Sequence, residues 1–247
     1  EILASYNNSL ILLSAQIDSL LDRYKYFGSM ILTDRDLNIL NQRGTEDVGT
    51  WDAIQYLARL STLARSSDPG SSNNDIVVFL GNNHRAYSSL YGTYAITPSE
   101  EERVFGIASI EHKSWVFKKI PGTSQREVLS FIQNMRYTRL AVEINIDLEH
   151  VRALLMNLQT SGGGRAFLID RNGEAVFSYE NPGIELKSQI DEMIGSGLST
   201  SQFTFEQEGE KYRIVYNKSG SSGLIFGMYF PEKKMLAPIT GVNNYIL

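Results

Sequence analysis

Residues 164–178 have the sequence GRAFLIDRNGEAVFS, in which two short apolar runs are joined by Asp170-Arg171-Asn172-Gly173. An aspartate at the start of such a link can hydrogen-bond within its own turn. Asn172 and Gly173 tolerate the positive φ that a tight connection needs. The stretch therefore predicts a β-hairpin.

A second stretch of the same kind occurs earlier in the chain. The apolar run 76–80 (IVVFL) continues through Gly81-Asn82-Asn83-His84 into the run 85–88 (RAYS). Two similar hairpins suggest two similar modules, and the segments that follow each hairpin test this idea.

Each hairpin is followed by one helix and then by three strands. The first helix begins with a complete capping box, in which Thr97 is the cap, Pro98 the first helical residue and Glu100 the third, and it is expected to reach about Ile110. Alternating or continuous apolar runs predict the strands. They lie at 115–117, 127–135 and 140–146 in the first module, and, after a helix at 186–194, at 201–206, 211–217 and 224–230 in the second. The same order occurring twice indicates an internal repeat.

A long amphipathic helix precedes the two modules. Large apolar residues alternate in steps of four and three, at Tyr6, Leu10, Leu13, Ile17, Leu20, Tyr24, Phe27 and Ile31. Such a helix of about 26 residues spans roughly 40 Å, and polar residues interrupt its surface, which excludes a membrane span. It either packs only on its own domain or also pairs with a second subunit. Thr33 is expected to cap a short helix that ends near Gly44, and Thr50 a further helix over 51–65.

The sequence thus predicts an α+β fold with a long N-terminal helix and two modules, each a mainly antiparallel sheet of about five strands with flanking helices. The boundaries follow from the elements: the helix covers 1–32, the first module 33–147 and the second 148–231, while 232–247 begin a helix leading out of the domain.

Composition limits the function classes. A formal charge of −5 argues against a surface that neutralises nucleic-acid phosphates, and the absence of cysteine excludes disulfides, cysteine-bound zinc and thiol nucleophiles. The chain starts at Glu1 and contains no apolar run long enough to span a membrane. We therefore expect a piece excised from a longer protein, for instance from between two membrane segments.

The helix over 6–31, the hairpin over 166–176 and the closing strand GLIFGMYFP at 223–231 together resemble the double Cache domain. This is the tandem PAS-like extracytoplasmic sensor of bacterial transmembrane receptors. The chain looks most similar to sensors of Gram-positive YesM-type histidine kinases and membrane-bound AraC-type regulators. The resemblance implies that a small molecule or an extracellular binding protein engages the membrane-distal module, 33–147, and that the terminal helices carry the signal across the membrane. It also implies an extracellular location between two transmembrane helices.

Aromatic and cationic residues near the first module's strands are the candidates for ligand contact, with core packing as the alternative for each. They are Tyr87, Tyr91, Tyr94, Trp115, Arg136 and Tyr137. Amino-acid-binding Cache domains carry an aromatic–arginine–tryptophan–tyrosine arrangement with a later aspartate, which does not match this sequence. An amino-acid ligand is therefore not implied.

No catalytic, cofactor or metal motif emerges. The histidines at 84, 112 and 150 lack metal-ligand spacing, Ser161-Gly162-Gly163-Gly164 lacks the lysine of a phosphate loop, and no Gly-x-Ser-x-Gly elbow occurs. We expect a non-enzymatic sensor without a cofactor. A ligandless domain that senses a protein or cell-wall partner and an extracytoplasmic enzyme are the alternatives, and homodimerisation through the N-terminal helix stays open.

Overall fold

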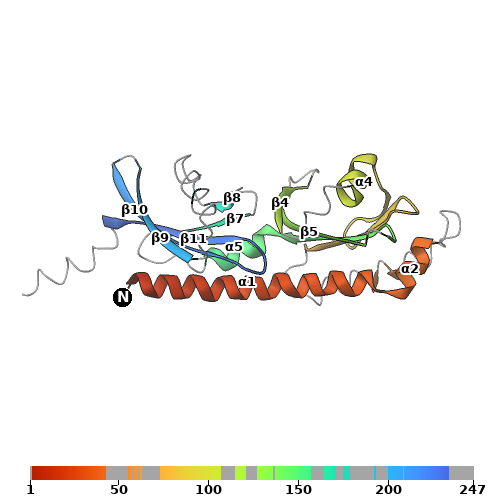
Figure 1. The fold of residues 1–247 in the computed structure, drawn as a ribbon, viewed down its shortest axis with the longest axis horizontal. Helices are drawn as coiled ribbons and strands as arrows, with labels where there is room; N and C mark the ends of the chain where they lie inside the picture. The colour runs from red at the N-terminus through yellow and green to blue at the C-terminus, as the bar shows by residue number, and fades with distance from the viewer. Residues whose placement is uncertain are drawn as a thin grey trace, which may run out of the picture. The chain divides into compact units, whose positions relative to one another are not determined.

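The computed structural model of the 247-residue chain describes residues 2–42, 55–56, 58–59, 62, 73–106, 115–120, 127–135, 137–156, 164–170, 175–178, 192, 200–207 and 209–233. The chain divides into two compact units, which are described separately. The central unit is Leu20–His150, and the terminal unit joins Glu1–Ser19 to Val151–Leu247. Figure 1 labels their helices and strands.

The predicted N-terminal helix is confirmed as α1 (Ile2–Leu32), which is one uninterrupted helix in Figure 1. Its buried positions follow the 3.6-residue period more closely than the predicted four-three alternation does. Leu21 is therefore fully buried in place of the predicted Leu20. The buried large apolar residues of α1 are Leu10, Leu13, Ile17, Leu21, Tyr24, Ile31 and Leu32.

The helix after α1 is α2 (Arg35–Gln42), and its predicted cap was wrong by one residue. Asp34, not Thr33, accepts the N–H groups of Asp36 (2.9 Å) and Leu37 (3.3 Å). The Thr33 hydroxyl instead donates back to carbonyl oxygens in the last turn of α1. The helix expected over 51–65 lies mostly outside the described residues.

The central unit contains a six-stranded sheet in which every neighbouring pair is antiparallel, in the order β3-β2-β1-β6-β5-β4. Five of its strands are those predicted from the sequence, and the edge strand β3 was not predicted. The strands are β1 (Asp75–Leu80), β2 (Arg85–Ser88), β3 (Gly92–Ala95), β4 (Val116–Lys119), β5 (Glu127–Met135) and β6 (Leu140–Asp147).

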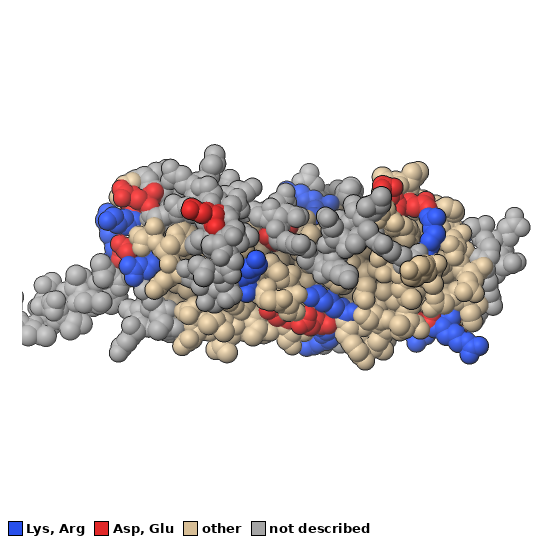
Figure 2. Space-filling model, viewed as in Figure 1, with Lys and Arg blue, Asp and Glu red and all other residues tan. Residues whose placement is uncertain are grey.

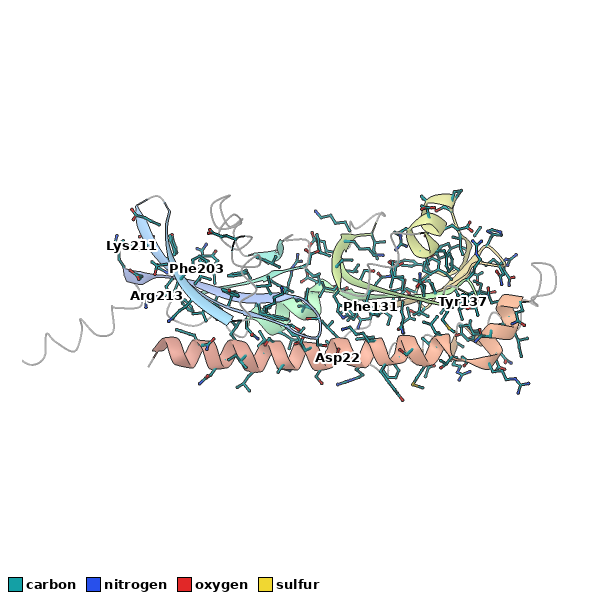
Figure 3. All side chains as sticks on the ribbon, in the orientation of Figure 1. Asp22, Phe131, Tyr137, Phe203, Lys211 and Arg213 are labelled. Atoms are coloured by element: carbon teal, nitrogen blue, oxygen red, sulfur yellow. The ribbon has the colours of Figure 1, made fainter. Side chains whose placement is uncertain are left out.

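One face of this sheet packs against α1. A Cβ added to Gly28 would lie 3.3 Å from Ile144 and 4.0 Å from Val142, so the helix approaches β6 closely. The Ser29 hydroxyl and the Gln133 amide are hydrogen-bonded at 3.0 Å on the same face. Phe131, labelled in Figure 3, lies on this face of β5, with the Lys25 ammonium 5.6 Å from its ring centroid.

Helix α4 (Pro98–Phe105) connects β3 to β4, and its predicted capping box is confirmed. The Thr97 backbone N–H donates to the Glu100 carboxylate (3.0 Å), and the Glu100 N–H donates to the Thr97 hydroxyl (3.3 Å). The helix ends at Gly106, which is earlier than predicted. Helix α5 (Leu148–Met156) follows β6, and the Asp147 carboxylate accepts the N–H of Glu149 at 2.9 Å.

The terminal unit contains a five-stranded antiparallel sheet in the order β8-β7-β11-β10-β9. This order repeats β2-β1-β6-β5-β4 of the central unit, so the repeat inferred from the sequence is confirmed at the level of topology. The strands are β7 (Arg165–Ile169), β8 (Ala175–Ser178), β9 (Thr200–Gln207), β10 (Glu210–Lys218) and β11 (Ile225–Pro231). The hairpin predicted over residues 164–178 is thus formed by β7 and β8.

In the terminal unit α1 also packs on one face of the sheet. The rings of Tyr6 and Phe230 have centroids 4.5 Å apart, and the Asn217 amide donates to the Ser14 hydroxyl at 2.6 Å. The opposite face is apolar and is called the apolar face below. It consists of Phe167, Ile169, Ile214, Tyr216, Ile225 and Tyr229, with Phe203 and Tyr212 packed against them.

Candidate functional site

A buried carboxylate lies in the middle of the central sheet. Glu143 is on β6, between β1 and β5, and is only 2% exposed. Arg103 of α4 forms a two-pronged ion pair with it, at 2.7 and 3.0 Å, and the Ser130 hydroxyl donates to Oε1 at 2.9 Å. The Lys118 ammonium of β4 also donates to Oε1. Two cations therefore share one carboxylate.

The surroundings keep Glu143 ionised. Burial alone would raise the pKa of this carboxyl, but the charge of Lys118 and the hydrogen bonds and charge of Arg103 outweigh burial and hold the pKa below its ordinary value. For Arg103, burial acts to lower the pKa, and the hydrogen bonds to Glu143 more than reverse this, so the guanidinium stays charged.

The local sequence explains how Arg103 reaches Glu143. The capping box fixes the start of α4, and Val104, fully buried, anchors the helix on the sheet. The Asn134 amide of β5 donates to the Val104 carbonyl at 3.0 Å. Arg103, one residue before this anchor, is thereby held over β6.

Asn145 lies two residues beyond Glu143, so both side chains lie on the same face of β6. Asn145 is 2% exposed, and within the described part of the chain its Oδ1 atom has no hydrogen-bond partner. A buried acceptor without a partner destabilises a fold by about 1–3 kcal/mol. Four other atoms of the described residues share this property: Oδ1 of Asn83, the hydroxyls of Tyr87 and Tyr216, and the indole N–H of Trp115. Asn145 differs from them in lying on the same strand face as a charged cluster, which makes it the atom to test for a ligand contact.

Asp75 of β1 is directly opposite Asn145 in the sheet. Its carboxylate accepts the hydroxyls of Ser88 (2.8 Å) and Ser89 (2.9 Å) and the N–H of Leu90 (3.2 Å). These bonds fix the turn between β2 and β3, so Asp75 already has a structural role. The same side of the sheet also carries an apolar cluster that includes Val77, Phe79, Ala86 and Ala141. We call the polar part of this side the polar face; it comprises Asp75, Ser88, Lys118, Ser130, Glu143 and Asn145, covered by Arg103.

The six residues predicted to contact ligand are not gathered in one place. Tyr94 lies on the same side of the sheet as the polar face. It is opposite Ala86 of β2, and Ala86 is opposite Phe79 of β1, which lies on the same side of β1 as Asp75. Tyr94 is half-buried, and burial, followed by the charges of Glu100 and Glu143, raises the pKa of its hydroxyl, which therefore stays protonated.

Tyr87 and Trp115 lie on the opposite, α1-facing side. The Trp115 ring is 5.3 Å from that of Phe131, and the Tyr87 ring is 6.4 Å from that of Tyr56. Both residues are at most 1% exposed, as core packing requires. The structure buries both rings, and the Tyr87 hydroxyl and the Trp115 indole N–H have no hydrogen-bond partner among the described residues. Ligand contact therefore stays a prediction for both residues.

Two further candidates are on the surface. Tyr91 is 61% exposed, and Tyr137, labelled in Figure 3, is fully exposed in the turn after β5. Arg136 lies outside the described residues.

The residues that the sequence argument missed are Glu143, Asn145, Arg103 and Lys118. The predicted strand 140–146 alternates apolar and polar residues, which is typical of a strand with one solvated face. The polar residues Glu143 and Asn145 were visible in this strand. Their burial could be inferred only from the position of β6 inside the sheet, where all eight of its residues are buried.

Other chemistry finds no support in the described residues. Among them, no group of three or more histidine, aspartate or glutamate side chains could hold a metal ion. His84 lies 3.4 Å from the Glu101 carboxylate on the surface, and the side chains of His112 and His150 lie outside the description. On the side shown in Figure 2, positive and negative side chains of the described residues are interspersed, without an extended basic area.

Solved structures share this architecture. The extracellular domain of mmHK1S-Z3, described as a histidine kinase, matches with a TM-score of 0.65 at 14% identity, over 96% of this chain and 98% of that one. The extracellular domain of rpHK1S-Z16, described in the same way, gives 0.66 at 12% identity, over 93% and 94%. The ligand-binding domain of the Campylobacter jejuni chemoreceptor Tlp3, in complex with L-valine, gives 0.55 at 10% identity, over 94% of each chain.

The chain thus has the α+β fold of extracellular sensor domains, with a long N-terminal helix followed by two PAS-like modules. No sequence family and no curated protein matches the chain at a significant level. No helix among the described residues is both long and apolar enough to cross a membrane.

Proposed function

We propose that the chain is the extracytoplasmic ligand-sensing domain of a bacterial transmembrane signal-transduction receptor, and that the polar face of the central unit binds its ligand. The observation that carries this proposal is the unpartnered Oδ1 atom of Asn145, buried beside the Glu143 ion cluster. A protein interior normally pairs such atoms, so a donor from a bound molecule would complete the environment of this one.

The fold supports the same proposal. Two of the similar structures are extracellular domains described as belonging to histidine kinases, and a third is a chemoreceptor domain with a bound small molecule. A histidine kinase is the output we propose for the full receptor, of the YesM type suggested by the resemblance. A chemoreceptor output is the alternative, while an AraC-type output has no support among these structures.

Signal transmission in this proposal uses α1. The helix contributes residues 2–19 to the terminal unit and 20–32 to the central unit. A ligand shifts such a receptor only if it binds one of two conformations more tightly than the other. The module boundaries at 33–147 and 148–231, and the extracellular location between two membrane spans, belong to this proposal.

A thermal-shift screen tests the proposal directly. A library of sugars, carboxylates and short peptides is expected to contain a stabiliser, because a ligand at 100 times its Kd adds about 2.7 kcal/mol to the stability of the folded state. The shift should disappear in Lys118→Gln and persist in Lys119→Gln, whose side chain is 62% exposed and pairs with Glu127.

If no library compound raises the melting temperature, either alone or together with candidate extracellular binding proteins, small-molecule sensing would be contradicted. Stabilisation by a binding protein alone would favour a domain that senses a protein partner. Turnover of a library compound, lost in Glu143→Gln, would instead favour an enzyme.

A further inference from the structure

The chemistry of the polar face narrows the ligand class, provided that the proposed sensing function holds. We propose that the polar face binds a small monocarboxylate that also carries a hydroxyl group. The carboxylate is held by the outward N–H groups of Lys118 and Arg103, and the hydroxyl donates to the Oδ1 atom of Asn145.

The need for an anion follows from the ion cluster. Glu143 accepts from Arg103, Lys118 and Ser130, so its oxygens are fully engaged by three residues. The two cations share its single charge, because neither forms an ion pair with another carboxylate among the described residues. The side chains of Arg103 and Lys118 remain 37% and 29% exposed, which leaves further N–H donors within reach of a bound molecule. Carboxylates and phosphates are the groups that such charged donors bind strongly, and of the two the carboxylate carries a single charge at neutral pH.

Other charges near the polar face limit the ligand to one negative charge. Asp75 and Asp147 lie on the same side of the sheet, and Glu100 lies on α4 near Tyr94. Asp75 is engaged by Ser88, Ser89 and Leu90, and Asp147 by the start of α5. These carboxylates have their own structural donors and repel a second negative charge, so a dicarboxylate is not expected.

The need for a hydroxyl follows from Asn145. Its Oδ1 atom is a neutral acceptor, and the carboxylates of Glu143 and Asp75 beside it are already engaged. A buried ammonium needs a charged partner to offset its desolvation, whereas a hydroxyl is satisfied by a neutral acceptor. Asn145 and Glu143 are roughly 7 Å apart along β6, so one small molecule can reach both the Asn145 amide and the cations that pair with Glu143.

A matched set of compounds tests the class on the intact 247-residue chain. The set contains four compounds with the same three-carbon skeleton. Lactate carries both the carboxylate and the hydroxyl, and propionate carries only the carboxylate. Alanine has an ammonium in place of the hydroxyl, and 1,2-propanediol has only hydroxyls. The same comparison is repeated with longer 2-hydroxy acids of up to six carbons. Calorimetry should show at least one hydroxy acid binding at least tenfold tighter than each of its three counterparts.

Variants assign the two contacts. Lys118→Gln should weaken the hydroxy acid at least tenfold, Lys118→Arg should restore most of the affinity, and Lys119→Gln should leave it unchanged. Asn145→Ala should remove the preference of the hydroxy acid over its propionate-type counterpart while retaining weak carboxylate binding. Thermal unfolding without ligand shows which variants fold. If Asn145→Ala does not fold, Lys118→Gln and Lys118→Arg still test the carboxylate contact.

The outcomes separate this inference from the sensing proposal. Tighter binding of the amino acid, or equal binding of the propionate type, overturns the role of Asn145. Absence of binding throughout the series, together with a stabiliser of another class that requires Lys118, overturns the ligand class and leaves the sensor. Absence of any stabiliser in the broad screen overturns both.

Discussion

The two sheets have the same strand order, and on the side that faces away from α1 both carry an apolar cluster, but within the described part of the chain only the central sheet adds a buried ion cluster. On β6 of the central unit these positions include Glu143 and Asn145, and on β11 of the terminal unit they are Ile225, Gly227 and Tyr229. The Phe167 ring lies directly over Gly227, where any Cβ would collide with it. The terminal sheet therefore places apolar side chains at these positions, with the Tyr216 hydroxyl unpaired among the described residues, and the central sheet places charges and the unpaired Asn145 amide oxygen there.

The fold therefore does not require charges on the side of the sheet that faces away from α1. The terminal unit shows an apolar solution on the same topology, and an apolar solution is usually at least as stable as a buried ion cluster. Polar groups that stability does not need are best explained by binding. The comparison leads to four tests, which follow in order of decreasing effect on stability.

The largest effect is expected for Phe167→Ala. Phe167 is 1% exposed and fills the space above Gly227, so truncation leaves a cavity and should destabilise the terminal unit by about 3–5 kcal/mol. Urea unfolding with hydrogen exchange in β10 and β11 measures this loss. Tyr137→Ala, at a fully exposed site, is the control and should be neutral. An unchanged midpoint for Phe167→Ala would show that the apolar face is not packed as described.

Glu143→Gln should destabilise the central unit by about 2 kcal/mol. The change leaves Arg103 and Lys118 without their shared charge, a loss that is discounted from the fully buried case because both side chains are partly exposed. Glu127→Gln removes a surface ion pair of 3.5 Å and should change stability by less than about 1 kcal/mol. Equal effects of the two variants in urea unfolding would contradict the special position of Glu143.

These two variants also show what sequence could and could not provide. The hairpins, the long helix and the strand order were predictable because periodicity, turn residues and caps are local signals. Thr97 and Glu100 were assigned correctly for this reason. The burial of Glu143 was not predictable, since alternation along β6 has the same appearance whether the polar side meets water or other segments of the protein.

The positions of the candidate residues could not be predicted for a related reason. Aromatic residues such as Tyr87 and Trp115 are conspicuous in a sequence, but which side of a strand faces α1 depends on register with distant strands. The partners of Glu143 are separated from it by 40 residues for Arg103 and 25 for Lys118. A site assembled over such separations is visible only after the sheet order is known.

Acid should destabilise the native protein through Glu143, and this effect should be absent from Glu143→Gln. The folded state holds the pKa of Glu143 below its ordinary value of 4.5. The stabilisation is therefore fully present above pH 4.5 and is lost as the pH falls through the lower folded pKa. The melting temperature of the native protein should fall more steeply with acid in this range than that of Glu143→Gln. Parallel curves would show that Glu143 is not held ionised by its partners.

The smallest change in stability is expected for the variant that makes the polar face resemble the apolar face. Replacing Arg103, Lys118 and Glu143 together by methionine removes every member of the ion cluster and leaves no unpaired charge. The unfolding free energy should stay within about 1 kcal/mol of the native value or rise, although Glu143→Gln alone lowers it. Ligand stabilisation should vanish at the same time. A triple variant as unstable as the single one would mean that the charges serve the fold, whereas a stable variant that no longer responds to ligand would assign them to binding.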